Sequence, residues 1–201
     1  MEFYELGLQP YLPIWEKRKA FTQTRDKETV DECWFVEHCP VYTQGLAGKH
    51  AHLLNLGDVP LVHSDRGGQV TYHGPGQLMV YLMVDLHRLS MGIKAFIYAL
   101  EDSVIQLLEL YEIIAHRKCK APGVYVQEQK IASLGLRVKN GCTYHGMALN
   151  VNMDLGPFKG INPCGFDGLR MAQMKDFVPN ITLDDIIHPL KAILSHAYRR
   201  E

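Results

Sequence analysis

The chain has 201 residues, of which 47% are hydrophobic and 21% charged, and its formal net charge is −1. This length and composition are typical of an ordinary globular protein with one hydrophobic core. The small net charge excludes a global field that would recruit nucleic acid or membrane. No run of about 18 apolar residues occurs, and no basic segment precedes a long apolar one. We therefore expect a single cytoplasmic domain over residues 1–201.

Hydrophobic periodicity and turn residues predict strands and helices that mix without a regular βαβ order. In chain order the predicted elements are a helix (13–27), two strands (33–37 and 60–63), a strand buried on both faces (77–85), an amphipathic helix (93–111), three short strand segments (123–126, 130–134 and 143–151) and a last helix (183–198). This order predicts an α+β or mixed α/β domain built on a largely antiparallel sheet.

The last two helices carry the clearest signals. Thr182, with Asp185 three positions later, predicts a capping box at the start of the last helix. In the helix predicted over 93–111, apolar residues fall on one stripe. They are Phe96, Ile97, Leu100, Val104, Leu107 and Leu108.

Two short basic clusters lie at residues 17–19 and 117–120. Each is interpreted as a solvated face, and the alternative is a contact for an acidic partner. The five cysteines are odd in number, irregularly spaced and without a C-x-x-C pair, which favours free thiols in a reducing compartment. Cys33, His38 and Cys39 lie close in sequence, but no second ligand pair follows at zinc-site spacing. No metal site is expected.

The segment 66–77 is Arg-Gly-Gly-Gln-Val-Thr-Tyr-His-Gly-Pro-Gly-Gln. Its glycines permit positive φ and a close approach of backbone to a ligand, and exposed N–H groups can bind a carbonyl or phosphate oxygen. The same composition is typical of a hairpin turn that enters the strand at Gln77. By itself this segment does not decide between a binding loop and a turn.

Lys130 begins a short apolar strand that Gly135 interrupts. It is either a strand-end charge in water or a lysine held over a pocket, where partial desolvation suits it to acid or base chemistry. The small residues Gly146 to Ala148 can wall a narrow apolar tunnel. The His145-Gly146 step repeats His73-Gly74, and neither histidine receives a role from the sequence alone.

Cys164 lies between Pro163 and Gly165, in a segment that is neither a clear helix nor a clear strand. Such a turn can hold a thiol toward a pocket, and a neighbouring ammonium lowers the pKa of a thiol below its free value of about 8.5. A single cysteine is more often a small buried hydrophobe. That interpretation is kept for the other four cysteines.

Four motifs in family order make the chain resemble the lipoyl(octanoyl) transferases. They are Arg66 to Gln77; Lys130-Ile131-Ala132 with Gly135 and Arg137; Thr143, His145-Gly146, Ala148 to Val151 and Asp154-Leu155; and Pro163-Cys164-Gly165. An upstream match covers much of Glu37 to Gly45, so the resemblance spans about residues 37–165. Cys39, where relatives often have proline, is a minor departure.

The resemblance implies an acyltransferase that moves an octanoyl group from octanoyl-acyl carrier protein to a lysine of a lipoyl domain, through an acyl-enzyme thioester. The family nucleophile falls on Cys164 and its partner lysine on Lys130. The substrate-binding stretches fall on Arg66, Gly67, Gly68, Gln69, Val70, Thr71, Tyr72, His73, Ser133, Leu134, Gly135, Gly146, Met147 and Ala148. The implied fold is that of the biotin and lipoate ligase catalytic domain, with the motif-bearing core at about residues 30–180.

The implied acceptors are the lipoyl domains of 2-oxoacid dehydrogenase complexes and the glycine cleavage H protein. ATP is not expected to be needed, because thioester exchange is near thermoneutral, and no cofactor is expected. We also expect a monomer that binds no nucleic acid or membrane. One alternative is an ATP-dependent lipoate ligase of the same superfamily, which has no need of Cys164. Another is a non-catalytic acyl-binding module. A cysteine hydrolase with His73 or His145 as base is a more distant one.

Overall fold

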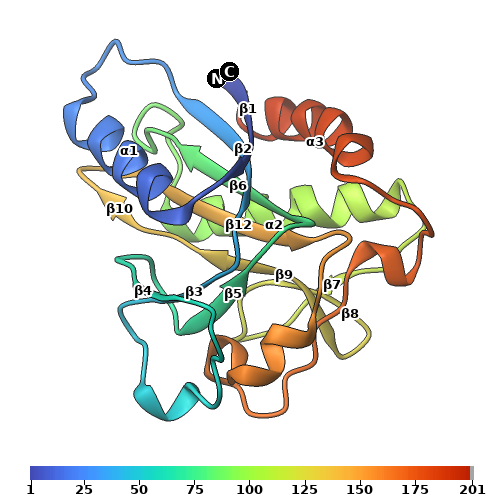
Figure 1. Cartoon of the computed structure of the whole chain (residues 1–201). Helices are drawn as coiled ribbons and strands as arrows, with labels where there is room; N and C mark the ends of the chain where they lie inside the picture. The colour runs from blue at the N-terminus through green and yellow to red at the C-terminus, as the bar shows by residue number, and fades with distance from the viewer. Residues whose placement is uncertain (200–201) are drawn as a thin grey trace.

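A seven-stranded mixed sheet forms the centre of the computed structural model, which describes residues 1–199 (Figure 1). Its strand order is β1-β2-β6-β12-β9-β8-β7. The edge pair β1–β2 is parallel and every other pair in this sheet is antiparallel. The strands are β1 (Glu2–Gln9), β2 (Glu32–His38), β6 (Gln77–Met83), β7 (His116–Arg117), β8 (Val124–Val126), β9 (Gln129–Gly135) and β12 (His145–Asn150). The predicted fold class is confirmed.

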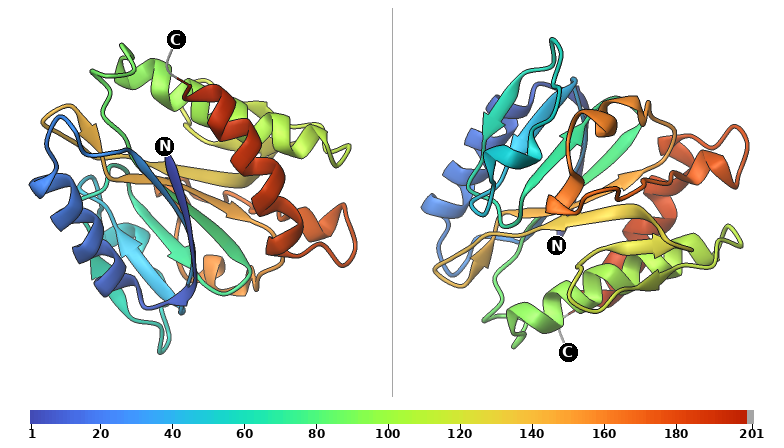
Figure 2. Two further views of the ribbon diagram at one scale, coloured as in Figure 1. Left: turned by 90° about the horizontal axis from the view of Figure 1, so that it is seen from above. Right: turned by 90° about the horizontal axis from the view of Figure 1, so that it is seen from below.

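Three α-helices of the described residues cover the two faces of this sheet. In the views from above and below, α1 (Tyr11–Thr24) lies on one face, and α2 (Ile93–Glu109) and α3 (Leu183–Ala197) lie together on the other (Figure 2). The predicted stripe of α2 is buried against the sheet except for Ile97, which is partly exposed. The predicted capping box is present, since Thr182 Oγ1 accepts from Asp185 N and Asp185 Oδ2 accepts from Thr182 N.

Two smaller sheets and four 3₁₀ turns complete the fold of residues 1–199. A three-stranded sheet has the order β4 (Leu61–His63), β3 (Val41–Gln44), β5 (Val70–His73), and a hairpin joins β10 (Val138–Lys139) to β11 (Cys142–Thr143). The 3₁₀ turns are η1 (His50–His52), η2 (Gly156–Gly160), η3 (Pro163–Gly165) and η4 (Met174–Asp176). In Figure 1, β3, β4, β5 and η1 to η3 lie together below the main sheet.

Several strands differ from the sequence-based expectation. Strand β1 was not predicted, because it is an edge strand with many exposed residues and so has little apolar alternation. Strand β5 is part of the glycine-rich segment that the sequence left undecided, and it pairs with β3 before the turn into β6. The single strand predicted over 143–151 is divided at Tyr144, because β11 pairs with β10 whereas β12 pairs with β6 and β9.

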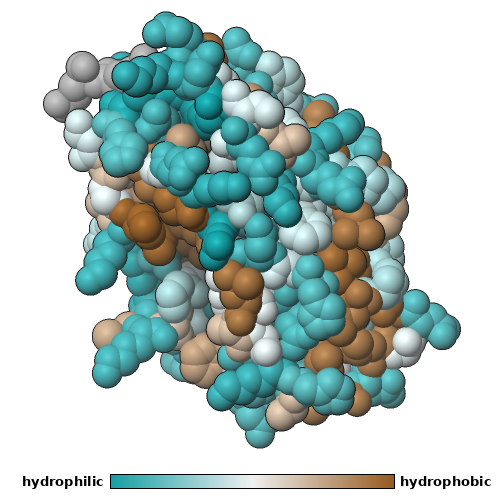
Figure 3. All heavy atoms as spheres, turned by 90° about the vertical axis from the view of Figure 1, so that its left-hand side faces the viewer, coloured by the Kyte–Doolittle hydropathy of each residue, from teal (hydrophilic) through white to brown (hydrophobic). Residues whose placement is uncertain are grey.

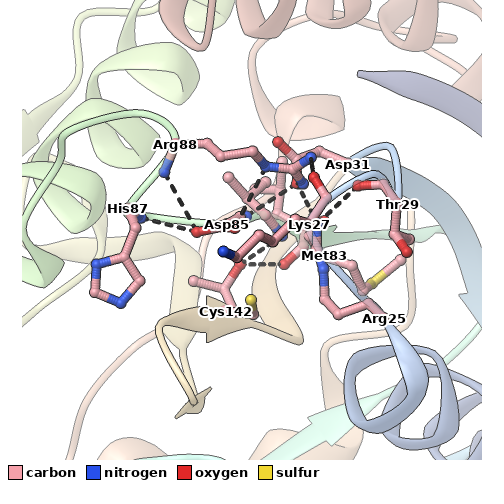
Figure 4. A network of polar contacts seen from close by, with 12 residues as sticks. Arg25, Lys27, Thr29, Asp31, Met83, Asp85, His87, Arg88 and Cys142 are labelled. Carbon is pink, nitrogen blue, oxygen red and sulfur yellow. Dashed lines mark hydrogen bonds and ion pairs between the residues drawn. The ribbon is translucent and has the colours of Figure 1, made fainter.

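An ion-pair network fastens the segment after α1 to the segment after β6 (Figure 4). Asp31 Oδ1 accepts from Arg25 Nη2 and Arg88 Nη2, each at 2.6 Å, and from the backbone N–H of Asp85 at 2.9 Å. Asp85 also forms a β-bridge with Cys142 of the β10–β11 hairpin. The network therefore fixes one end of this hairpin, whose strand β10 borders the cavity described below.

The interpretation of residues 17–19 as a solvated face is wrong for Arg18. Lys17 and Lys19 are exposed, whereas Arg18 is 0% exposed. Successive helix residues are 100° apart, so the middle residue of the cluster points toward the sheet. The side of the molecule that carries α1 is mostly hydrophilic, with separate apolar groups between the polar side chains (Figure 3).

The five cysteines are free. Cys33 and His38 lie on opposite faces of β2: Cys33 belongs to the core under α2 and α3, and the His38 ring contacts Tyr81 and Tyr11 on the other face. Within residues 1–199 no group of three His, Cys, Asp or Glu residues is arranged to hold a metal ion. No helix in this part of the chain is long and apolar enough to cross a membrane.

Candidate active site

A cavity of about 640 Å³ lies where the glycine-rich segment meets β9 and the start of β12. Every predicted substrate-binding residue lines it except Tyr72. Side chains alternate along β5, so Thr71 and His73 face the cavity while the Tyr72 ring packs against Tyr42 and Phe158 on the other side. The structure thus gives Tyr72 a place in an apolar cluster, away from the cavity.

Further lining residues were not predicted as site residues from the sequence. They are Tyr11, Leu46, Met79, Tyr81, Ile93, Ile97, Lys120, Pro122, Leu136, Arg137, Val138, His145 and Phe166. Period-2 alternation along β6 was the available signal for Met79 and Tyr81, which share one face. Tyr11 belongs to helix α1, and no pattern in the sequence indicated that it lies at the cavity.

The cavity wall is apolar with a positive charge balance. Four cations line it, namely Arg66, Lys120, Lys130 and Arg137, and no Asp or Glu does so among residues 1–199. Leu46, Ile93 and Phe166 are exposed large apolar residues that also line the cavity. Such a cavity suits an acyl chain inside and an anionic or carbonyl-bearing group near the cations.

Cys164 and Lys130 lie in direct contact in this cavity. Lys130 Nζ donates to Cys164 Sγ at 3.1 Å. Cys164 has φ 57° and ψ 13°, and Gly165 follows with φ 79°. The left-handed region is unusual for a residue other than glycine and occurs preferentially at functional sites. A thiol beside an ammonium is the arrangement expected of an activated nucleophile.

The lysine is held in place by its neighbours. Lys130 is 1% exposed, and a Cβ at Gly123 would lie 2.3 Å from Lys130 Cε, so the side chain needs glycine there. Lys130 Nζ also lies 5.4 Å from the centre of the Tyr125 ring, a cation–π contact. The backbone of Lys130 pairs with the segment that follows the Cys164 turn: Lys130 N donates to Arg170 O at 2.9 Å.

Arg66 is a buried cation without a carboxylate partner within residues 1–199. Its Nε and Nη2 donate to Thr43 Oγ1 at 3.1 and 2.9 Å, and its Nη1 donates to Gly67 O at 2.9 Å. Burial lowers the pKa of the Arg66 guanidinium from its ordinary value. A guanidinium stays charged in proteins even so, and its bonds to Thr43 and Gly67 replace the lost water.

The two histidines of the cavity are neutral and fully bonded to other groups. His145 Nδ1 lies 3.1 Å from Arg18 Nη1, and its Nε2 lies 3.0 Å from Asp65 Oδ1. Because a guanidinium can only donate, Nδ1 accepts and Nε2 carries the proton. Burial lowers the pKa of His145 to about 4, and burial holds the pKa of His73 well below its ordinary value. Neither ring bonds to Cys164 among the described residues, which disfavours the hydrolase alternative.

The fold and the site define a class of protein. Solved structures with the same fold include a bi-partite lipoate protein ligase from Thermoplasma acidophilum, with a TM-score of 0.78 at 17% identity over 100% of this chain and 86% of that one. A biotin protein ligase from Aquifex aeolicus matches with a TM-score of 0.60 at 11% identity, over 99% of this chain and 69% of that one. The chain therefore has the fold of the lipoate and biotin ligase catalytic domains.

Sequence relatives narrow this class. The family model for the lipoyl protein ligase A/B catalytic domain matches residues 10–195. An octanoyltransferase of Legionella pneumophila (strain Paris) is 58% identical over 92% of this chain and 94% of its own length. One from Photorhabdus laumondii is 53% identical over 90% of this chain and 85% of its own length. The chain belongs to the lipoyl protein ligase A/B catalytic domain family, on its octanoyltransferase branch, and is an acyltransferase.

Proposed function

We propose that this chain transfers an octanoyl group from octanoyl-acyl carrier protein to a lysine of a lipoyl domain, through a thioester on Cys164. The observation that carries the proposal is the contact of Lys130 Nζ with Cys164 Sγ at 3.1 Å beside an apolar cavity of about 640 Å³. The relatives named octanoyltransferases support the acyl group. Residues 1–201 act as one catalytic domain in this proposal.

In the first half-reaction Lys130 stabilises the thiolate of Cys164, because an ammonium in contact with sulfur favours the charged form. The thiolate attacks the carbonyl carbon of the donor thioester, and the tetrahedral intermediate collapses with cleavage of the donor C–S bond. The leaving thiolate takes a proton from Lys130. One thioester replaces another, so the step is near thermoneutral and needs no ATP.

In the second half-reaction the neutral amine of the acceptor lysine attacks the acyl-enzyme carbonyl. The C–S bond to Cys164 breaks, and neutral Lys130 takes the amine proton, which restores the starting ammonium and thiolate. Conversion of a thioester into an amide is downhill and drives transfer. Because each buried CH₂ adds only about 0.8 kcal/mol, the apolar wall discriminates modestly between neighbouring chain lengths unless its end clashes with the chain.

A lipoyl domain as acceptor is supported by the Thermoplasma acidophilum neighbour, whose structure is described together with its E2 lipoyl domain. By the family resemblance we extend this to the lipoyl domains of 2-oxoacid dehydrogenase complexes and to the glycine cleavage H protein. Octanoyl-acyl carrier protein is proposed as the donor because a Cys164 nucleophile can exchange one thioester for another.

Intact-protein mass spectrometry after mixing with octanoyl-acyl carrier protein, without ATP, tests the proposal. Wild type and Cys119→Ser, which changes an exposed cysteine, are expected to gain one octanoyl group that hydroxylamine removes. Cys164→Ser is expected to gain none that hydroxylamine removes. An unmodified wild type, together with transfer from free octanoate that requires ATP, would instead establish the ligase alternative.

A further inference from the structure

A chain of buried hydrogen bonds begins at Arg66, on the glycine-rich side of the cavity. Its guanidinium donates to Thr43 Oγ1 from Nε and Nη2. Thr43 Oγ1 lies 3.1 Å from His73 Nε2, and His73 Nδ1 lies 2.7 Å from Gln77 Oε1. The chain thus passes from the start of the glycine-rich segment, through β3 and β5, to the first residue of β6.

The same chain continues from β6 to the backbone of Lys130. Gln77 Nε2 donates to Asn150 Oδ1 at 2.8 Å, and Asn150 Nδ2 donates to Ala172 O at 2.9 Å. Ala172 N in turn donates to Lys130 O at 2.9 Å. The two strands meet in register here, since Gln77 and Asn150 are direct partners in the β6–β12 ladder.

The donors and acceptors of the chain all point in one direction. The guanidinium can only donate, so the Thr43 hydroxyl accepts from it and donates its own O–H hydrogen bond to His73 Nε2. His73 then carries its proton on Nδ1 and donates to Gln77 Oε1, which leaves the Gln77 amide nitrogen to donate to Asn150. Thr43, His73, Gln77 and Asn150 are all buried, so each broken link leaves a polar group without water.

The Asn150 amide binds at the place where the backbone of Lys130 pairs with the segment that follows Cys164. Strand β12 ends at Asn150, and beyond it Lys130 forms a parallel bridge with Met171 instead. The segment around Met171 follows the Cys164 turn by only a few residues in the sequence. By binding Ala172 O, Asn150 fixes this segment against Lys130, and with it the position of Cys164 relative to the ammonium.

We infer that Thr43, Gln77 and Asn150 are positioning residues, which hold the Arg66 loop and the Lys130–Cys164 pair in one arrangement. Within residues 1–199, none of these three side chains forms a hydrogen bond to Cys164 Sγ or Lys130 Nζ. The inference rests on the proposed function for its catalytic consequence. Its geometric consequence, the environment of the Cys164 thiol, is measurable without any acyl donor.

The first experiment compares Asn150→Ala with Asn152→Ala. Asn152 is two positions further on, and its amide donates in a different direction, to Ile181 O at 3.5 Å. Asn150→Ala is expected to slow single-turnover acylation about 10- to 100-fold, the range for loss of a residue that orients a reactive group. The pH profile of Cys164 alkylation by iodoacetamide is expected to change, because the thiol loses its fixed position against the Lys130 ammonium. Asn152→Ala is expected to stay within about twofold of wild type in both measurements.

Stability is measured for each variant, and rates are compared well below its unfolding transition. A loss of stability in Asn150→Ala with unchanged acylation and an unchanged alkylation profile would overturn the inference. If Asn150→Ala does not fold, Asn150→Asp tests the same link, because it keeps the size of the side chain and places an oxygen against Ala172 O. Absence of an octanoyl adduct on wild type would defeat the proposed function only, since the alkylation profile still reports the position of Lys130.

The second experiment tests the far end of the chain. Thr43→Val keeps the shape and removes the hydroxyl, whereas Thr43→Ser keeps the hydroxyl. The valine variant is expected to slow acylation about tenfold, and the serine variant much less. The double variant Thr43→Val/Asn150→Ala is expected to lose clearly less than the product of the single losses. If the loss of acylation rate in the double variant is within about twofold of that product, the two ends act independently and the hydrogen bonds between them do not couple them.

Discussion

The two faces of the main sheet are built from the same strands but differ in the buried polar groups that they carry. Toward α2 and α3, strands β2 and β6 present residues such as Phe35, Val80 and Leu82 to a closed apolar core. Toward α1, the alternate positions of these strands form a smaller apolar cluster that includes Val36 and Met79. Buried polar groups such as Arg18 and His38 lie on the same face, beside the cavity. Stability is concentrated on the first face, and the groups that can do chemistry are on the second.

The polar face keeps its charges by bonding them to neutral groups. Arg18 is stacked 3.5 Å above the Tyr81 ring and donates to Tyr144 O at 2.9 Å, with no carboxylate partner among residues 1–199. Burial of a cation costs free energy that such contacts only partly offset. Changes on the α1 face should therefore alter the reaction rate more than the stability, and changes on the α2–α3 face the reverse.

The largest effect is expected from Lys130→Met. Removal of the ammonium that contacts Cys164 should lower single-turnover acylation by about 10²–10⁴-fold, the usual contribution of an acid–base group. Unfolding free energy should be kept or raised, because an apolar side chain of similar length replaces a buried cation. Quenched-flow acylation and urea unfolding measure the two quantities. A rate within tenfold of wild type would remove Lys130 from the mechanism.

The matching change on the apolar face is Leu100→Ala, at a buried position of α2. Deletion of a buried leucine side chain is expected to cost about 2–5 kcal/mol of unfolding free energy. At a temperature where the variant is folded, the acylation rate should stay within about twofold of wild type. A large loss of rate at full stability would mean that the two faces are not separable.

The apolar face is also the part of the fold that its sequence pattern predicted best. The stripe of α2, apart from Ile97, and the long apolar run of β6 were assigned correctly, because hydrophobic periodicity reports burial directly. The burial of Arg18 was not foreseen, since a charge within a basic run is ordinarily solvated. Contact between Gln77 and Asn150, 73 positions apart, depends on the register of β6 and β12, which no local pattern contains.

The candidate site was predicted to a different degree. Local reasoning left a structural and a chemical interpretation open for Lys130 and Cys164, and only the ordered family motifs selected them. Their contact could not be read from the sequence, because it requires the left-handed turn at Cys164 and the space that Gly123 leaves. The same motif transfer included Tyr72, since a contiguous motif does not record which residues of a strand face the ligand.

A smaller effect is expected from acid. Burial lowers the pKa of His38 from 6.5 to about 4, so the unfolded chain takes up a proton in this range while the folded chain does not. Stability should therefore fall as pH decreases from about 6.5 to 4, with about 2 kcal/mol lost through His38 by pH 5. Urea unfolding at pH 7, 6 and 5 should show a weaker pH dependence for His38→Gln. The exposed His63→Gln serves as control, and an equal slope in all three proteins would contradict this origin.

The smallest effect is expected at the rim of the cavity, where the polar face meets solvent. In the cluster at residues 117–120, Arg117 pairs with Asp102 and Lys118 with Glu128, each at 2.6 Å. Lys120 lines the cavity and has no ion pair among the described residues, so it is the charge of this cluster best placed to meet an acidic carrier protein.

Lys120→Glu should raise the KM for octanoyl-acyl carrier protein roughly fivefold, equivalent to about 1 kcal/mol, with little change in kcat. The control Lys17→Glu reverses an exposed charge on α1 and should leave the KM unchanged. Added salt screens exposed charges, so the KM of wild type should rise with ionic strength toward that of Lys120→Glu. Equal KM values for the two variants at low salt would assign carrier recognition to other residues, and the exposed apolar rim of Leu46, Ile93 and Phe166 would be the next surface to change.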